Sequence, residues 1–318
     1  MAMLSTYLAS TVDSVLTTTL ANYRKQLIDN IFDDFVLLWW LREKGKVRHD
    51  DGGTSIVEHI LYQKSSAGGW YSGYEQLDTT PQEGLRPAEF LWRQCAYSIS
   101  ISRLEERQNS GKNRMINLLE AKTYQAEQSI KDNIAAALLA SSRATKAINT
   151  LNELVDSSGT IGGIDRSTNS WWQSTETASG SFASQGISDM RTLYNTVSSS
   201  AGKDHPDLII TTRAIYEYYE NTLLPQVRYQ SLEMANAGFE SLRFKAADIT
   251  YDQYGISGVL FMLNSKYITL VIDTETDFIT TPFARPSNQD AKTAQILFMG
   301  NVTINNPRRM GKLTGISA

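Results

Sequence analysis

Apolar residues recur at steps of three or four in two long stretches of the chain. In residues 11–44 they fall on one face of a helix, since a helix has 3.6 residues per turn. In residues 112–141 the apolar face includes Ile130, Ile134 and Leu138. The second helix would be on the order of 45 Å long. We therefore expect it to act as a spine, with these three residues facing the chain's own sheet and the final strand, at Leu297, Met299 and Val302.

Between the two helices the pattern favours β-strands at 54–62 and 88–102. The irregular stretch between them carries Trp70, Tyr71 and Tyr74. Such a long connection is uncommon inside a compact domain, and a two-stranded ribbon has no core of its own. The pattern predicts an extended loop whose aromatic side chains are covered either by another part of the chain or by another chain.

Serine, threonine and glycine dominate residues 141–186, which makes this stretch the best boundary between two parts of the chain. Beyond it the elements are short and mixed. The pattern predicts helices at 187–199 and 213–224, a strand at 208–211, a hairpin formed by 259–263 and 267–272, and a last strand at 296–304.

Composition excludes several classes of protein. The 318 residues include 41% hydrophobic and 20% charged residues, which is enough apolar material for a core. The net charge of −4 argues against a generally basic nucleic-acid binder. A single cysteine, Cys95, excludes an internal disulfide and a cysteine-based zinc site. The longest apolar run, 36–41, is far shorter than the roughly 20 residues of a membrane span, so the default expectation is a soluble intracellular protein.

Catalytic signatures are weak throughout. The acidic pairs are adjacent in sequence and are explained by solvated faces or ion pairs. The cluster His205-Pro206-Asp207 contains the histidine and the acid of a possible catalytic triad. The sequence has no Gly-x-Ser-x-Gly motif to supply the serine, and a polar turn explains the cluster better. Trp171 and Trp172 are candidates for a sugar-stacking platform, but packing against their own subdomain is favoured. We therefore expect no enzymatic activity, no cofactor and no metal site.

The order of elements and four strings resemble one family. The strings are Glu43-Lys44-Gly45-Lys46-Val47-Arg48 with Gly52-Gly53-Thr54, the stretch from Arg103 to Asn109, Gly163-Ile164-Asp165-Arg166-Ser167-Thr168-Asn169-Ser170-Trp171-Trp172, and Gly300-Asn301-Val302 with Pro307-Arg308-Arg309-Met310-Gly311-Lys312-Leu313. Together they resemble the major capsid (coat) protein of tailed phages over essentially the whole chain.

The resemblance implies an α+β fold, the tailed-phage major capsid fold. It implies an N-terminal helical arm at 1–50, an extended loop at 51–87, a peripheral subdomain with the spine helix at 88–150 and 278–318, and an axial subdomain at 151–277. The inter-subunit contacts of the extended loop would be made by Lys64, Trp70, Tyr71 and Tyr74. Trp171 and Trp172 would pack the axial subdomain.

The function that the resemblance implies is structural. Pentamers and hexamers of the chain would assemble in the host cytoplasm into the icosahedral shell of a virion that encloses double-stranded DNA without sequence-specific binding. Portal, scaffolding and decoration proteins would be partners, and no membrane would be involved. Because the arm starts almost at Met1, we expect a separate scaffolding protein or a processed product. Lys64 and Asn305 or Asn306 are available for a crosslink of the kind that some members form.

Two alternatives remain open at the level of sequence. One is an encapsulin-like bacterial nanocompartment shell with the same fold and an enzyme cargo. The other is a carbohydrate-active enzyme that uses Trp171, Trp172 and Asp165. Particle formation separates both shells from the enzyme. Neighbouring genes for a portal and a terminase would favour the virus, and a neighbouring gene for a cargo enzyme would favour the compartment.

Overall fold

The computed structural model describes residues 35–76, 78–108, 118–199, 204–223 and 241–318. Within these residues the chain divides into two compact units, one that includes 94–134 and 275–299, and another formed by 35–93, 135–274 and 300–318. The predicted helix at 11–44 lies outside the described residues up to residue 34. Its last part is present as α2.

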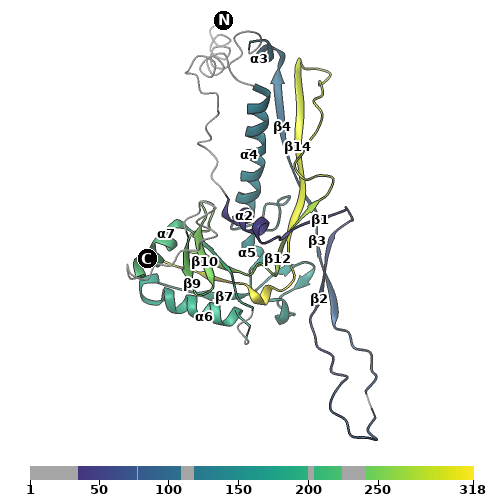
Figure 1. The fold of residues 1–318 in the computed structure, drawn as a ribbon, viewed down its shortest axis with the longest axis vertical. Helices are drawn as coiled ribbons and strands as arrows, with labels where there is room; N and C mark the ends of the chain where they lie inside the picture. The colour runs from purple at the N-terminus through teal and green to yellow at the C-terminus, as the bar shows by residue number, and fades with distance from the viewer. Residues whose placement is uncertain (1–34, 77, 109–117, 200–203, 224–240) are drawn as a thin grey trace. The chain divides into compact units, whose positions relative to one another are not determined.

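Helices and strands are mixed along the chain (Figure 1), which confirms the expected α+β class. The helices are α2 (Val36–Glu43), α3 (Arg103–Gln108), α4 (Leu118–Leu139), α5 (Leu151–Leu154), α6 (Ile187–Val197) and α7 (Arg213–Thr222), with short turns η2 (Ser170–Trp172), η3 (Phe182–Gly186) and η4 (Pro307–Arg309). The strands are β1 (Val47–Asp50), β2 (Ile56–Leu61), β3 (Leu85–Phe90), β4 (Arg93–Ser102), β5 (Thr160–Ile161), β6 (Ile164–Asp165), β7 (Thr175–Ala178), β8 (Leu208–Thr211), β9 (Leu242–Phe244), β10 (Ala247–Tyr251), β11 (Leu260–Leu263), β12 (Ile268–Asp273), β13 (Ile279–Thr280), β14 (Ala291–Ile304) and β15 (Gly311–Thr314).

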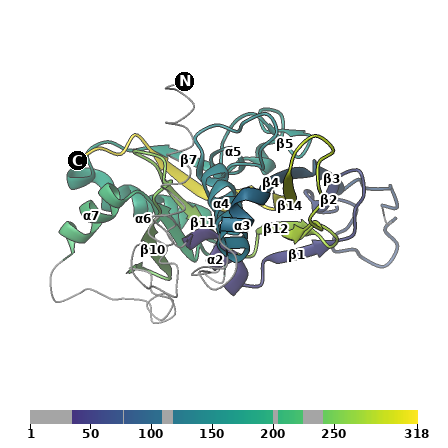
Figure 2. The same cartoon turned by 90° about the horizontal axis from the view of Figure 1, so that it is seen from above.

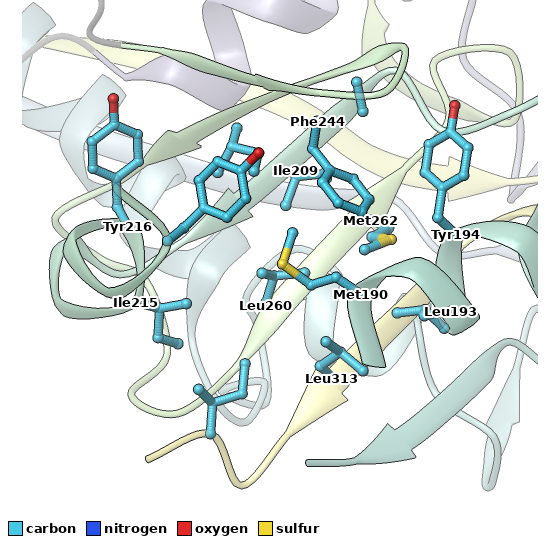
Figure 3. Packing of buried hydrophobic residues seen from close by; sticks show 14 of the residues in the cluster. Met190, Leu193, Tyr194, Ile209, Ile215, Tyr216, Phe244, Leu260, Met262 and Leu313 are labelled. Atoms are coloured by element: carbon cyan, nitrogen blue, oxygen red, sulfur yellow. The ribbon is translucent and has the colours of Figure 1, made fainter. Parts of the chain in front are cut away.

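The second unit is built on a six-stranded sheet in the order β7-β15-β11-β8-β10-β9. Helices α6 and α7 lie beside it (Figure 2). Met190 and Leu193 from α6 share one buried cluster with Ile209 and Met262 from the sheet and with Ile215 from α7 (Figure 3). Because alternate residues of a strand point to opposite faces, both helices cover the same face. Strands β8 and β11 are buried along their whole length, which explains their unbroken apolar sequences.

The two runs predicted as a hairpin are strands, but they do not pair with each other. Strand β11 lies in the six-stranded sheet, whereas β12 pairs with β1 and β14 in another sheet. Side chains hold the connection between them: Asn264 Nδ2 donates to Asp204 Oδ1 at 2.9 Å, and the Ser265 N–H donates to Asp207 Oδ1 at 2.9 Å. Strand β11 pairs with β8 and β15, and β12 pairs with β1 and β14. Because each strand has its own two neighbours, the chain passes from one sheet to the other between β11 and β12.

The C-terminal region differs from the predicted subdomain map. Residues 278–318 are expected to lie in one subdomain with 88–150, but β15 is hydrogen-bonded between β11 and β7 in the six-stranded sheet. Strand β15 is too short and too interrupted by glycine to be recognised from the sequence pattern. It becomes a strand because its neighbours satisfy its backbone on both sides.

In the first unit, helix α4 runs along strand β4. Lys122 Nζ donates to the Ser100 carbonyl at 3.1 Å, and Asn133 Nδ2 donates to the Tyr97 hydroxyl at 2.9 Å. In β14, Ile296 and Phe298 are the buried residues, whereas the expected residues Leu297 and Met299 are half-buried. Burial thus favours the neighbours of Leu297 and Met299, which lie on the opposite face of the strand, whereas Val302 is buried.

Candidate functional site: the extended loop and its root

Strands β2 and β3 form an antiparallel ribbon, and the chain continues beyond them through residues 62–84 (Figure 1). The run predicted as one strand at 88–102 is divided: its first residues belong to β3 in the ribbon, whereas β4 pairs with β14 in another sheet. One face of the ribbon is buried. The other face is open to solvent, since Leu61 and Leu85 lie opposite each other and are 72% and 74% exposed. Neither leucine was singled out in the sequence, although both alternate with buried positions. The ribbon therefore carries an exposed apolar pair in addition to its aromatic residues.

The four residues predicted for inter-subunit contact all lie in the 62–84 connection. Trp70 and Tyr74 are fully exposed, Tyr71 is 66% exposed, and Lys64 is exposed as well. The described part of the chain therefore does not cover the aromatic side chains. Within the described residues, Trp70 and Tyr74 therefore have no cover from their own chain.

The root of the loop is closed by a glycine turn. The Glu89 N–H donates to the Gly162 carbonyl at 3.0 Å. Gly162 has φ +59°, and a Cβ there would lie 2.9 Å from the Ala88 Cβ and 3.2 Å from the Phe90 ring. Both the backbone conformation and the lack of space require glycine at this position.

Each strand of the ribbon is also contacted by the turn at residues 165–172. Trp171 stacks on Tyr62, directly after β2, with ring centroids 5.0 Å apart and planes at 24°. Arg86 Nη1, in β3, donates to Asn169 Oδ1 at 3.4 Å. The turn thus contacts both strands of the ribbon at the end from which the 62–84 connection continues.

The turn itself is organised by Arg166, whose side chain is 1% exposed. Its guanidinium donates to the carbonyls of Leu154 at 2.6 Å, Glu153 at 2.8 Å, Ser158 at 3.2 Å and Trp172 at 3.3 Å. Burial lowers the pKa of Arg166 to about 10, so the side chain stays charged at neutral pH. Sequence reasoning placed Arg166 in a family string without a role, because its partners are backbone carbonyls that no pattern identifies.

The paired tryptophans have separate roles in packing. Trp172 is fully buried and donates its indole N–H to the Ile161 carbonyl at 3.1 Å, while Trp171 is half-buried. Asp165 accepts hydrogen bonds from the backbone and the hydroxyl of Ser167, which lower its pKa. Trp172 is fully buried and offers no open face to a sugar, and Trp171 stacks on Tyr62, so packing explains both tryptophans.

The other chemical candidates also lie in structural surroundings. The His205 ring nitrogen Nδ1 is 3.1 Å from the Pro206 carbonyl, and Asp207 accepts from the Ser265 backbone. Burial raises the pKa of Asp207, and burial also raises the pKa of the Cys95 thiol. Among the described residues, no group of three or more histidine, cysteine and acidic side chains is arranged to hold a metal ion.

The three spine residues are buried. Ile130 and Leu138 are 0% exposed, and Ile134 is 4% exposed. No helix in the described ranges is long and apolar enough to cross a membrane.

Comparison with solved structures places this architecture among capsid proteins. A chain of the capsid asymmetric unit of cyanophage A-1(L) matches with a TM-score of 0.70 and 15% identity, covering 95% of this chain and 98% of that one. A chain of the capsid of an empty GTA particle matches with a TM-score of 0.65 and 10% identity, covering 97% and 99%. A chain of the capsid of Myoviridae phage XM1 matches with a TM-score of 0.57 and 15% identity, covering 94% and 98%.

No family model matches the sequence, and a search of characterised proteins finds no match. The likeness is therefore one of fold, and it extends over nearly the full length of each chain. The chain has the fold of tailed-phage capsid proteins, as the sequence resemblance implied.

Proposed function

We propose that this chain is a structural major capsid protein of a tailed double-stranded DNA phage. It self-assembles as pentamers and hexamers into an icosahedral shell that encloses the genome. The observation that carries the proposal is a full-length match to capsid chains, combined with a loop whose aromatic side chains have no cover in the described part of their own chain. An exposed apolar surface of this kind is typical of a protein–protein contact.

The extended loop is the element that we assign to inter-subunit contact, through Lys64, Trp70, Tyr71 and Tyr74. Burying apolar surface stabilises a contact by about 25 cal/mol per Å². One such contact is weak, but a closed shell repeats it in every subunit, and each subunit is held by several neighbours. In this proposal the sheet carrying β8 and β11 belongs to the axial subdomain, together with β15, and α4 is the spine of the peripheral subdomain.

The partners in this proposal are further copies of the chain, a portal protein, a scaffolding protein and a decoration protein. Assembly takes place in the host cytoplasm, and the protein is then part of the virion. The packaged DNA is enclosed without sequence-specific binding, which the net charge of −4 supports, since a wall without excess cations does not hold the duplex tightly. The protein has no cofactor and no enzymatic activity.

The nanocompartment alternative shares the fold, and the similar chains described above come from phage and GTA capsids, which favours the phage shell. The deciding experiment is to express the full chain with and without a scaffolding protein and to examine it by light scattering and negative-stain microscopy. We expect closed shells, or rings of five and six subunits. A monomer near 35.5 kDa under all salt conditions, with scaffold supplied, would contradict the proposal.

A further inference from the structure

A cavity of about 400 Å³ lies at the root of the extended loop. Its walls come from the end of β2, the turn at 171–172, helix α6 and the segment that follows β14. The lining residues are His59, Ile60, Leu61, Tyr62, Trp171, Trp172, Thr196, Tyr267, Asn305, Asn306, Arg308 and Arg309. Its volume is within the range of about 300–1,000 Å³ typical of sites that bind a ligand group.

One wall of the cavity is aromatic and another is cationic. The stacked pair of Tyr62 and Trp171 forms the aromatic wall. Arg308 and Arg309 form the cationic wall, and none of the described residues in the lining is an aspartate or a glutamate. A group that fits both walls carries an aromatic ring and a negative charge.

The charge of the two arginines is only partly compensated. Arg309 donates Nη1 to the Val197 carbonyl at 3.3 Å, and its Nε is 3.8 Å from Asp204 Oδ2. Asp204 is already bonded to Tyr267, Asn264 and Lys266. Arg308 is exposed and has no ion pair or side-chain hydrogen bond within the described part of the chain. Arg308 is therefore the cation that is available to an incoming carboxylate.

The tip of the extended loop has the complementary chemistry. It presents Trp70, Tyr71 and Tyr74 to solvent. The stretch from 65 to 85 contains acidic residues but no lysine or arginine, and its acidic residues are Glu75, Asp78 and Glu83. The carboxylate of Glu75 lies beside the aromatic residues, because it accepts a hydrogen bond from the Ser72 N–H at 3.0 Å.

The cavity and the tip do not meet within one chain. Trp70 is fully exposed, and the stretch from Leu61 to Trp70 spans on the order of 30 Å when extended. A protruding segment that fits a cavity elsewhere on the same molecule makes a head-to-tail contact. Repetition of such a contact around an axis closes a ring.

We infer that the cavity binds the loop tip, residues 70–75, of a second copy of the chain. The aromatic side chains of the tip lie against Tyr62 and Trp171, and the Glu75 carboxylate pairs with Arg308. This contact rests on the proposed self-assembly and names the surface on which the loop is received.

Two single-cysteine variants test proximity in a Cys95→Ser background. One population carries Ser72→Cys at the tip, and the other carries Asn305→Cys at the rim of the cavity. The two are mixed, assembled and treated with a short bis-maleimide reagent. We expect crosslinked dimers that contain one copy of each variant, and only after assembly. Particles of normal size without this crosslink would overturn the inference.

A charge exchange tests the pairing itself. Arg308→Glu is expected to lower the yield of particles about tenfold, because two carboxylates then face each other. Adding Glu75→Arg should restore the yield. Arg243→Glu makes the same charge change at an exposed position on β9 and should leave assembly unchanged.

The outcomes separate this inference from the proposed function. If the unaltered chain forms no particles, the proposed function fails. If it forms particles and Arg308→Glu assembles equally well, the inference fails and the proposed function stands. Circular dichroism of each variant checks folding, and a folded Arg308→Glu subunit that Glu75→Arg does not rescue also overturns the pairing.

Discussion

Two buried cations account for much of the local structure in the second unit. Arg166 joins four carbonyls of the segment between α5 and η2. Lys312 in β15 is 3% exposed and lies 3.3 Å from Asp156, 3.6 Å from Glu176 and 3.1 Å from the side-chain oxygen of Asn152. Both cations connect loops to regular elements, so each is tested by removing its charge or one of its partners.

Replacing Arg166 with leucine should destabilise the subunit by about 3–5 kcal/mol, because several buried carbonyls lose their donors at once. Urea unfolding followed by circular dichroism measures the loss. Arg166→Lys should recover only part of the stability, since an ammonium is a compact charge and lacks the planar fork of donors. The matched control is Arg243→Leu at an exposed position, expected to change stability by less than about 0.5 kcal/mol. Equal effects of the two leucine variants would contradict the role of Arg166.

The environment of Asp156 predicts that the free energy of unfolding depends on pH in the acidic range. Burial alone would raise its pKa, but the Ser158 N–H and the charge of Lys312 outweigh burial, and the pKa lies below its ordinary value. A carboxylate with a lowered pKa contributes stability above its unfolded pKa of about 3.9, and that contribution is lost as pH falls through the folded value. Unfolding free energy should therefore decline below about pH 4.

Asp156→Asn should reduce stability at neutral pH and weaken this acid dependence. Urea unfolding of both proteins at pH 7 and at the lowest pH where they remain folded gives the comparison. An identical slope with pH in the two proteins would show that Asp156 does not contribute.

At the scale of elements, the turn at 165–172 determines how the extended loop leaves the body of the second unit. Its two tryptophans lie side by side in sequence, yet one packs inward and the other contacts the ribbon. Trp172 stabilises the turn itself, whereas Trp171 restrains Tyr62 at the end of β2. Mutating each should therefore give a different result.

Trp172→Ala should cost about 3–5 kcal/mol, since it removes a fully buried side chain and leaves a cavity. Trp171→Ala should cost clearly less in the unfolding free energy, because Trp171 is half-buried. It should instead increase hydrogen exchange at the ends of β2 and β3, which can be followed by mass spectrometry. A large loss of global stability in Trp171→Ala, with unchanged exchange in the ribbon, would contradict this division of roles.

At the scale of the whole molecule, the described residues leave an apolar surface uncovered on the extended loop. Trp70, Tyr71 and Tyr74 are exposed in the described part of the chain, and we propose that they contribute to assembly. The fold likeness to capsid chains and this exposed surface support the same proposal.

Replacing Trp70, Tyr71 and Tyr74 together with serine should leave the melting temperature of the isolated subunit unchanged within about 1 °C, a shift well below that of a 1 kcal/mol loss. Particle yield, measured by sedimentation, should fall strongly because apolar burial between copies is lost. A variant with a lower melting temperature and normal particles would show that the three residues pack within their own subunit.

The sequence pattern alone was sufficient to predict an element where the periodicity of its apolar residues agrees with their burial in the structure. The helices α4, α6 and α7 and the strand β8 follow from the spacing of their apolar residues, and the exposed aromatic loop follows from the length of its connection. The α+β class and the resemblance to a capsid fold were predictable for the same reason, since the order of elements is itself a sequence property.

Only the tertiary structure decided which strands pair and what each loop residue contacts. The runs that form β11 and β12 have the pattern of a hairpin, yet they join different sheets, because partners distant in sequence satisfy their backbones. Strand β15, the four carbonyl partners of Arg166 and the stack of Trp171 on Tyr62 also depend on distant segments. Periodicity reports which face of an element is apolar, but the identity of the neighbour that covers that face is a property of the folded chain.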